Sequence, residues 1–315
     1  MDASTAEAVF DPWKPFPAQR YRLSFELRRP PTSLPFSGPA LRGAFGIALR
    51  QALCITRAPQ CEGCALLERC LWPAIFESTA TKGLSTAPLN GWSLAPLIER
   101  APDGSSRFAV EFLLAGPVRE HLALFAAQLE RAVARLEVPA LRGARPVGLE
   151  LALTREALRE GFHLRDHPRE LPAPPPAPRS ATWILHLSTP LRLASDGRDI
   201  PLHQWNARQL AMSVRARIQS LLGQGAPRVV FPFPNLAALD GLRLETQGLH
   251  RIATHFGSDE SGNPRLTSGY VGILPLRGEA EVLSALWPYF WLAQHLQIGK
   301  LTRGGFGLFR LEAAA

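Results

Sequence analysis

The stretch from Ile298 to Phe309 gathers residue types that bind anions, because it holds four glycines, a lysine and an arginine. Glycine adopts positive φ easily and lets a ligand approach the backbone closely. Successive free N–H groups in such a loop form an anion-binding concavity, and two side chains would add full charges beside it. A tight turn between a helix and a strand also uses glycines, so that interpretation stays open. The anion-binding candidates are Lys300, Arg303, Gly304, Gly305 and Gly307.

Two common phosphate-binding motifs do not describe this loop. In the nucleotide-binding P-loop a serine or threonine follows the lysine, whereas Leu301 follows Lys300 here. In the dinucleotide-binding fingerprint a helix follows the glycines, whereas this sequence predicts a strand after them. The loop therefore does not indicate a nucleoside triphosphate or dinucleotide site.

All four cysteines form a second cluster with the spacing C-x6-C-x2-C-x5-C, at Cys54, Cys61, Cys64 and Cys70. Cytosolic proteins rarely hold structural disulfides, so the spacing favours a metal site. Four thiolates suit tetrahedral Zn²⁺ and would leave no open position for chemistry, so we expect a structural zinc. An iron–sulfur cluster uses the same ligands, and unligated or disulfide-bonded cysteines are further alternatives.

The charge balance points to an anionic polymer as partner. The formal net charge is +8, and only three lysines occur, so arginine supplies nearly all of the positive charge. Arginine binds phosphate in a bidentate manner and stacks on bases, although a genome that favours arginine codons would produce the same bias. The basic balance therefore indicates nucleic acid before membrane.

Targeting signals are missing from the sequence. It contains no apolar run of the roughly 18 residues that a membrane span requires. The first ten residues are acidic and contain no apolar signal segment. We therefore expect a cytoplasmic protein with no membrane partner.

Hydrophobic periodicity predicts the element order strand, helix, strand, strand, helix, strand in each half of the chain. The expected elements of the first half are Tyr21–Arg29, a helix beginning at Pro39, Trp92–Ile98, Arg107–Leu114, Val118–Leu136 and Val147–Leu153. Those of the second half are Thr182–Leu187, Pro201–Leu222, Leu242–Phe256, Tyr270–Leu276, Glu279–Leu296 and Phe306–Leu311. This order predicts an α+β protein of tandem ferredoxin-like (RRM-like, βαββαβ) domains with a C-terminal Gly-rich loop and a small cysteine-cluster insertion.

The best domain boundary is the stretch 168–179, because its six prolines are typical of a semi-rigid linker. The expected division is an irregular N-terminal segment 1–19, a first domain 20–167 with the cysteine insertion 54–76, a Pro-rich linker 168–180, and a second domain 181–315 that carries the Gly-rich loop.

This organisation resembles the RAMP superfamily of CRISPR-associated RNA-binding proteins, and within it the repeat-cleaving pre-crRNA endoribonucleases of the sixth Cas family. The signature loop of that family resembles Gln297–Phe309, and its first turn and helix resemble Pro35–Gly46. Ser268–Gly272 is similar to the strand that faces RNA, and the cysteines with Trp72 and Phe76-Glu77 resemble a cysteine-bearing branch.

The resemblance implies cleavage of the CRISPR repeat without a catalytic metal. The 2′-OH attacks the adjacent phosphate, a general base takes its proton, an acid protonates the leaving 5′-oxygen, and the products are a 2′,3′-cyclic phosphate and a 5′-OH. Such chemistry depends on positioning and on electrostatic stabilisation. The implied partners are CRISPR repeat RNA or crRNA, to whose hairpin the protein would stay bound, and other subunits of an effector complex.

The sequence departs from the family at the general base, because no histidine precedes His121. The candidates for a base are His203, at the start of the second domain's first helix, and His255, beside the Gly-rich sheet. An arginine-only mechanism is the alternative, with Arg42 as its leading residue. Further RNA-binding candidates are Arg208 and Arg215 on the helix predicted over Pro201–Leu222.

Two other functions fit parts of the pattern. A non-catalytic RAMP subunit that binds and caps crRNA in an effector complex would explain the missing early histidine. An unrelated zinc protein that binds nucleic acid would require the glycine loop to be accidental. The complete loop and the tandem architecture favour the endoribonuclease.

Overall fold

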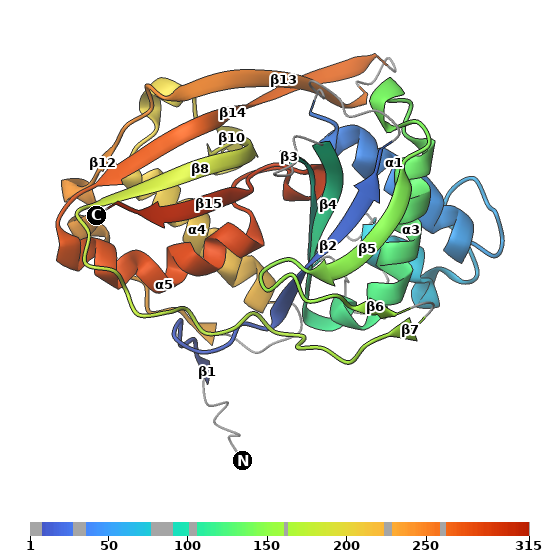
Figure 1. The fold of residues 1–315 in the computed structure, drawn as a ribbon, viewed down its shortest axis with the longest axis horizontal. Helices are drawn as coiled ribbons and strands as arrows, with labels where there is room; N and C mark the ends of the chain where they lie inside the picture. The colour runs from blue at the N-terminus through green and yellow to red at the C-terminus, as the bar shows by residue number, and fades with distance from the viewer. Residues whose placement is uncertain are drawn as a thin grey trace.

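The computed structural model describes residues 8–27, 36–76, 91–100, 106–160, 163–223, 229–258 and 263–314. Two antiparallel sheets lie side by side, and each has helices packed on one face (Figure 1). Each sheet has its own hydrophobic core, so the chain folds as two α+β domains. No helix of the described ranges has the length and apolar content needed to cross a membrane.

The first domain contains a four-stranded sheet of order β3-β4-β2-β5. Its strands are β2 (Ala18–Glu26), β3 (Trp92–Arg100), β4 (Ser106–Ala115) and β5 (Arg145–Leu151). Helices α1 (Gly38–Leu53) and α3 (Leu122–Arg135) cover one face. The central strands β2 and β4 are the first and third of the domain, which is the ferredoxin-like order.

Alternation along β2 directs its side chains to two different surroundings. Tyr21, Leu23 and Phe25 enter the core beneath the helices, where they meet Phe45 of α1. The residues between them face the other side of the sheet. Pro39 lies in the first turn of α1, where its fixed φ suits a helix start.

The second domain repeats this order, with β8 and β14 at the centre of a sheet β13-β14-β8-β15. Its strands are β8 (Thr182–Leu191), β13 (Leu249–Ser258), β14 (Pro264–Arg277) and β15 (Phe309–Ala313). Its helices are α4 (Ala207–Leu222) and α5 (Ala280–Leu296). The predicted order of elements is therefore found in both halves.

Several predicted boundaries differ from the structure. The predicted helix over Pro201–Leu222 is a short 3-10 turn, η4 (Leu202–Gln204), followed by α4, because Asn206 caps the helix through a reciprocal bond with Gln209. The predicted strand over Leu242–Phe256 divides into β12 (Arg243–Leu244) and β13. The helix predicted from Val118 begins with the 3-10 turn η2 (Gly116–His121).

The N-terminal segment predicted as irregular contains ordered pairing. β1 (Ala8–Val9) pairs in parallel with β11 (Val229–Val230), and β2 already begins at Ala18. Some predicted positions lie outside the described residues. These are Arg28 and Arg29 of the first strand, Pro35 and Glu77.

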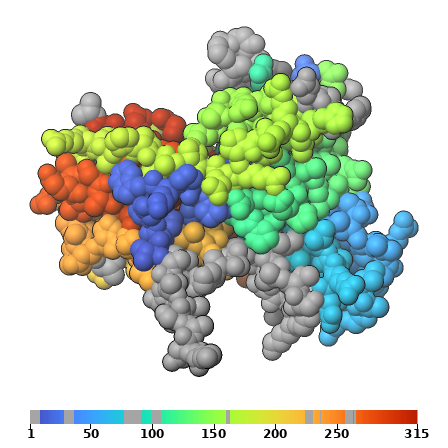
Figure 2. Space-filling model, turned by 90° about the horizontal axis from the view of Figure 1, so that it is seen from below, coloured from blue at the N-terminus to red at the C-terminus, as the bar shows by residue number. Residues whose placement is uncertain are grey.

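The Pro-rich stretch is packed against both domains. Leu171 is fully buried and pairs with Phe16, and the Gln19 side chain donates to the carbonyl oxygens of Pro168 and Glu170 at 3.0 and 3.1 Å. Trp287 of α5 donates to the Pro175 carbonyl at 2.8 Å. Figure 2 shows this part of the chain as a yellow-green band across both halves of the molecule. The stretch therefore braces the two domains.

Candidate functional site

The Gly-rich loop packs on the first domain, where the second sheet meets the start of α1. Its single turn, η6 (Thr302–Gly304), lies against β3. A Cβ added to Gly38 would lie 2.2 Å from the carbonyl oxygen of Gly304. Gly305 has φ +92°, and an added Cβ would lie 3.0 Å from the Cα of Gly38. These glycines are therefore required for close backbone contact between domains.

Gly307 closes the base of the loop. Its φ is +81°, and a Cβ there would lie 1.8 Å from the carbonyl oxygen of Ile298, whose N–H donates to the Gly307 carbonyl at 3.0 Å. Gly304, Gly305 and Gly307 are all buried. The requirement for a tight turn therefore explains why glycines occupy these positions. Contact between their backbone and RNA stays a prediction.

The same packing brings two arginines from different domains together. The Cζ of Arg303 lies 5.5 Å from the ring centroid of Trp92, and the Cζ of Arg42 lies 4.4 Å from that of Phe76. The rings of Phe76 and Trp92 stack, with centroids 5.9 Å apart. Both guanidinium groups therefore rest on a single aromatic stack.

Electrostatics in this arginine pair favour an anion. Burial lowers the pKa of Arg42 and of Arg303, and the charge of Arg42 lowers the pKa of Arg303 further. Both remain cations because a guanidinium in a protein keeps its proton near neutral pH. The aromatic faces offset part of the repulsion. A phosphate would relieve the rest, since guanidinium groups bind phosphate through paired hydrogen bonds.

A third cation extends this positive region behind the loop. Arg217 of α4 donates from Nε to the carbonyl oxygen of Leu296 at 2.9 Å. Burial, followed by the charges of Arg303 and Arg20, lowers the pKa of Arg217 to about 9, so it stays protonated near neutral pH.

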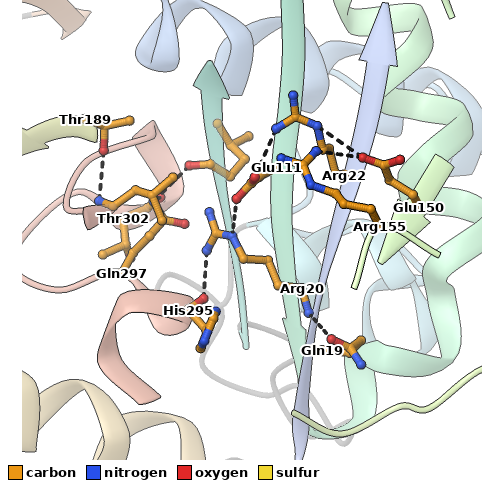
Figure 3. A network of polar contacts seen from close by, with 12 residues as sticks. Gln19, Arg20, Arg22, Glu111, Glu150, Arg155, Thr189, His295, Gln297 and Thr302 are labelled. Atoms are coloured by element: carbon orange, nitrogen blue, oxygen red, sulfur yellow. Dashed lines mark hydrogen bonds and ion pairs between the residues drawn. The ribbon is translucent and has the colours of Figure 1, made fainter. Parts of the chain in front are cut away.

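Beside the loop, a buried ion network holds the domains together (Figure 3). Arg20 donates to Glu111 at 2.6 Å and to the carbonyl oxygen of His295 at 2.7 Å. Arg22 contacts Glu111 at 3.2 Å and Glu150 at 3.4 Å. Burial alone would raise the pKa of Glu111, but the two arginines hold that pKa below its usual value. These arginines are engaged structurally and do not extend the anion site.

The two predicted bases lie on different elements of the second domain. His255 is exposed on β13, and the adjacent Thr254 donates to the carbonyl oxygen of Phe36 at 3.2 Å, next to the start of α1. His203 is exposed in η4, ahead of α4. Because successive side chains of a strand alternate between its two faces, the His255 side chain lies on the face of β13 opposite to Thr254, and His203 belongs to the helix layer.

The other basic candidates already have partners. Lys300 pairs with Asp199 at 3.4 Å and donates to the Gly197 carbonyl, which ties the loop to the hairpin of β9 (Ala194–Ser195) and β10 (Arg198–Asp199). Arg208 pairs with Asp240 at 3.6 Å, and Arg215 lies 6.0 Å from the Phe233 ring centroid. Each would have to exchange or share that contact to bind RNA.

Models of two known protein families match the chain, one in each domain. Residues 185–309 match the family described as CRISPR-associated endoribonuclease Cas6, and residues 16–145 match a family described only as an N-terminal domain. The second domain is a Cas6 domain. The match includes most of the Gly-rich loop, so the family predicted from this loop is confirmed. No match was found among curated proteins.

Solved Cas6 structures share the fold. Thermus thermophilus Cas6 is 18% identical with a TM-score of 0.50, over 94% of this chain and 98% of that one. A chain of a partial Cas6-RT-Cas1–Cas2 complex is 10% identical with a TM-score of 0.51, over 96% of this chain and 47% of that one. A Cas6 product complex is 19% identical with a TM-score of 0.49, and the alignment covers 94% of this chain and 99% of that one. The first two confirm the predicted tandem ferredoxin-like fold.

The four cysteines of the first domain line one cavity of about 340 Å³, together with Trp72 and several aliphatic side chains. None forms a disulfide, and Thr56 Oγ1 lies 3.8 Å from the Cys54 sulfur and 3.6 Å from that of Cys64. The Thr56 hydrogen bond lowers the pKa of Cys54. Among the described residues, no three His, Cys, Asp or Glu side chains are arranged to hold a metal. The cavity unites the predicted ligands, but the tetrahedral zinc site is not formed.

Sequence reasoning assigned no site role to three residues at the interface between the two domains. Phe76 and Trp92 provide the stack under the arginine pair, and Gln297 fixes the loop. Hydrophobic periodicity assigns an aromatic residue to the core, so it could not identify Phe76 and Trp92 as site residues. The one available signal was a large polar residue, Gln297, directly before the glycines.

Proposed function

We propose that the protein is a Cas6-family endoribonuclease that cleaves pre-crRNA within repeats during CRISPR RNA maturation. The observation that carries the proposal is the convergence of Arg42 and Arg303 at the Gly-rich loop of a Cas6 domain. A repeat phosphate placed between them would meet two guanidinium groups in a half-buried setting. Electrostatic stabilisation is stronger there than in water.

In the proposed mechanism the arginine pair holds the scissile phosphate. The 2′-oxygen forms a bond to phosphorus while the bond to the 5′-oxygen breaks, giving a 2′,3′-cyclic phosphate and a 5′-OH. Arg42 and Arg303 stabilise the charge that develops on the phosphate oxygens. The 2′-OH proton passes to a base and the 5′-oxygen gains a proton, and the guanidinium charges make a catalytic metal unnecessary.

His255 is the proposed base, with His203 as the second candidate. The preference rests on the strand alone: β13 packs next to the start of α1 through Thr254, and His255 would have to reach the phosphate from the exposed face of that strand. An imidazole titrates near neutral pH, so it can exchange a proton in either direction. If neither histidine acts, the arginine pair alone would position the phosphate for slower cleavage.

RNA beyond the cleaved phosphate needs further contacts, and we propose Lys300, Arg208 and Arg215 for them. Lys300 and Arg208 keep 36% and 49% of their side-chain surface exposed. Because each has an existing partner, each would contribute less affinity than Arg303. The proposed partners are repeat RNA, the retained crRNA hairpin and other effector subunits, in the cytoplasm.

We also propose that the four cysteines bind one structural zinc. The proposal is supported by the common cavity and by the lack of any disulfide among these four described cysteines. Thiolates are the ligands that Zn²⁺ prefers in structural sites, and a zinc would draw the four sulfur atoms together. The ion would stabilise the segment 54–70 and take no part in cleavage.

The test is incubation of labelled repeat RNA with the protein in EDTA. Cleavage that leaves a 2′,3′-cyclic phosphate supports the proposal. A mobility shift without cleavage would instead assign the non-catalytic role of a crRNA-capping subunit. A 3′-hydroxyl product or a strict Mg²⁺ requirement would refute the metal-independent mechanism, once circular dichroism shows that chelation leaves the fold intact.

A further inference from the structure

Gln297 occupies an unusual position directly after α5. It is fully buried, and its backbone has φ +59° and ψ 142°. A positive φ favours glycine, and other residues adopt it at a cost in conformational energy. A glutamine is present here although glycine would fit the backbone better. Its side chain must therefore provide something that glycine would not.

That side chain joins three separate segments. Nε2 donates to the carbonyl oxygen of Leu94 at 3.1 Å, across 203 residues of sequence. The carbonyl oxygens of Thr302 at 3.3 Å and Phe306 at 2.8 Å also accept from Nε2, so its two N–H groups are shared among three acceptors. One amide therefore holds the edge strand β3 of the first domain and the two ends of the segment 302–306, which contains the turn η6. Figure 3 shows Gln297 beside Thr302 at this junction.

Arg303 is fixed by these contacts. It lies inside the short segment whose two ends Gln297 holds, and its guanidinium group rests on Trp92, two residues before Leu94. Without a restraint, Arg303 would move away from the like charge of Arg42. The end of α5 is itself held, because Arg20 and Arg217 donate to the carbonyl oxygens of His295 and Leu296.

We propose that Gln297 is a positioning residue that holds Arg303 opposite Arg42 in the geometry required for RNA cleavage. The inference rests on the proposed endoribonuclease function and deepens it. Gln297 does not touch the reacting phosphate; it acts through Arg303. Only its Nε2 is engaged, because Oε1 has no hydrogen-bond partner within the described structure.

Gln297→Glu tests this role, since it keeps the shape but turns a carboxylate oxygen toward three carbonyl oxygens. The matched control is Gln294→Glu on the same helix. Oε1 of Gln294 accepts from Leu311 N at 3.1 Å, and a carboxylate preserves that bond. Gln297→Met provides a neutral side chain without a donor. Thermal denaturation shows whether each variant folds.

Single-turnover cleavage of repeat RNA and affinity for RNA with a 2′-deoxy scissile nucleotide separate positioning from binding. Gln297→Glu and Gln297→Met should cleave about 10–100-fold more slowly, since small displacements of a positioned group have effects of this size, while affinity changes little. In an Arg303→Ala background, Gln297→Glu should cause no further loss. Gln294→Glu should cleave like wild type. Equal losses in both backgrounds, or a wild-type rate in Gln297→Glu, would overturn the proposal.

Amide hydrogen exchange provides a readout that does not depend on cleavage. Gln297→Glu and Gln297→Met should speed exchange in residues 298–308, and Gln294→Glu should leave it unchanged. Failure of wild-type protein to cleave any repeat RNA would refute the proposed function. Hydrogen exchange alone would then test whether Gln297 holds the loop. Unchanged protection in Gln297→Glu and Gln297→Met would show that its side chain does not.

Discussion

Arg20 of the first domain donates to the carbonyl oxygen of His295 in the second at 2.7 Å, and the two residues are 275 positions apart in sequence. The same arginine contacts Glu111 at 2.6 Å. The arginine of a buried ion pair therefore also bonds the last turn of α5, close to Gln297 and the Gly-rich loop. The geometry of the proposed catalytic arginines thus depends on a polar contact between domains.

Arg42→Ala and Arg303→Ala should each slow cleavage by about 10²–10³-fold, which is typical when one preorganised donor to a developing negative charge is lost. Single-turnover rates on labelled repeat RNA would measure this. Arg192→Ala is a suitable control, because Arg192 is engaged with Asp199 outside the arginine pair. Unchanged rates in both test variants would remove the arginine pair from the mechanism.

The fold was largely predictable because strand alternation and amphipathic helices are local signals. Tyr21, Leu23 and Phe25 alternate into one core in the sequence and in the structure. The site was less predictable, because it depends on contact between residues such as Gly38 and Gly304 that are far apart in the chain. Sequence patterns identified Arg42 and Arg303 separately but could not bring them together.

The cysteine cluster shows another limit of sequence reasoning. Its spacing located Cys54 and Cys64 in one segment, and the structure places both in one cavity. Spacing cannot fix the directions of the sulfur atoms, however, because the intervening loop can arrange them in several ways. Ligand geometry therefore had to come from the structure, which shows thiols linked through Thr56.

Glu111→Gln should lower the free energy of unfolding by about 3–5 kcal/mol, because it leaves Arg20 and Arg22 buried without their shared carboxylate. Urea denaturation would measure the change. The matched control is Glu120→Gln, whose carboxylate is 65% exposed and pairs with Arg169. An exposed pair contributes little to stability, because water screens its charges. Equal effects of the two substitutions would contradict the structural role of the Glu111 network.

Acid should destabilise the interface through His295. Burial, followed by the charge of Arg20, lowers the pKa of His295 from its usual 6.5 to about 4. Between these values the unfolded chain binds a proton that the folded chain does not, so stability falls as pH decreases through this window. Melting temperatures across the window should therefore fall less in His295→Gln than in wild type. The control is His163→Gln at an exposed position, which should leave the pH dependence of the melting temperature unchanged.

Protein purified without chelator should contain about one zinc per chain by elemental analysis, because four cysteines make a complete structural site. Cys64→Ser should reduce the zinc content and the melting temperature, while cleavage by the folded fraction continues. Preparations that contain neither zinc nor iron would refute the metal site and leave free thiols in the cavity.

RNA affinity across a salt series should distinguish Arg303 from Lys300. Arg303→Met removes a cation that forms no ion pair with a carboxylate within the described residues, whereas Lys300→Met removes one that already pairs with Asp199. Each lost phosphate contact makes the log–log salt dependence shallower by about 0.7 for single-stranded nucleic acid. We expect that change for Arg303→Met and a smaller one for Lys300→Met.

Gly305→Val completes this experiment because it leaves the net charge at +8. An added Cβ would crowd Gly38, Phe36 and Pro96 at 3.0–3.1 Å in a backbone with φ +92°, so the melting temperature should fall. The salt slope of the folded fraction should stay that of wild type, since no cation is lost. A shallower slope in Gly305→Val, or a wild-type slope in Arg303→Met, would show that the loop's charges do not bind RNA phosphate as proposed.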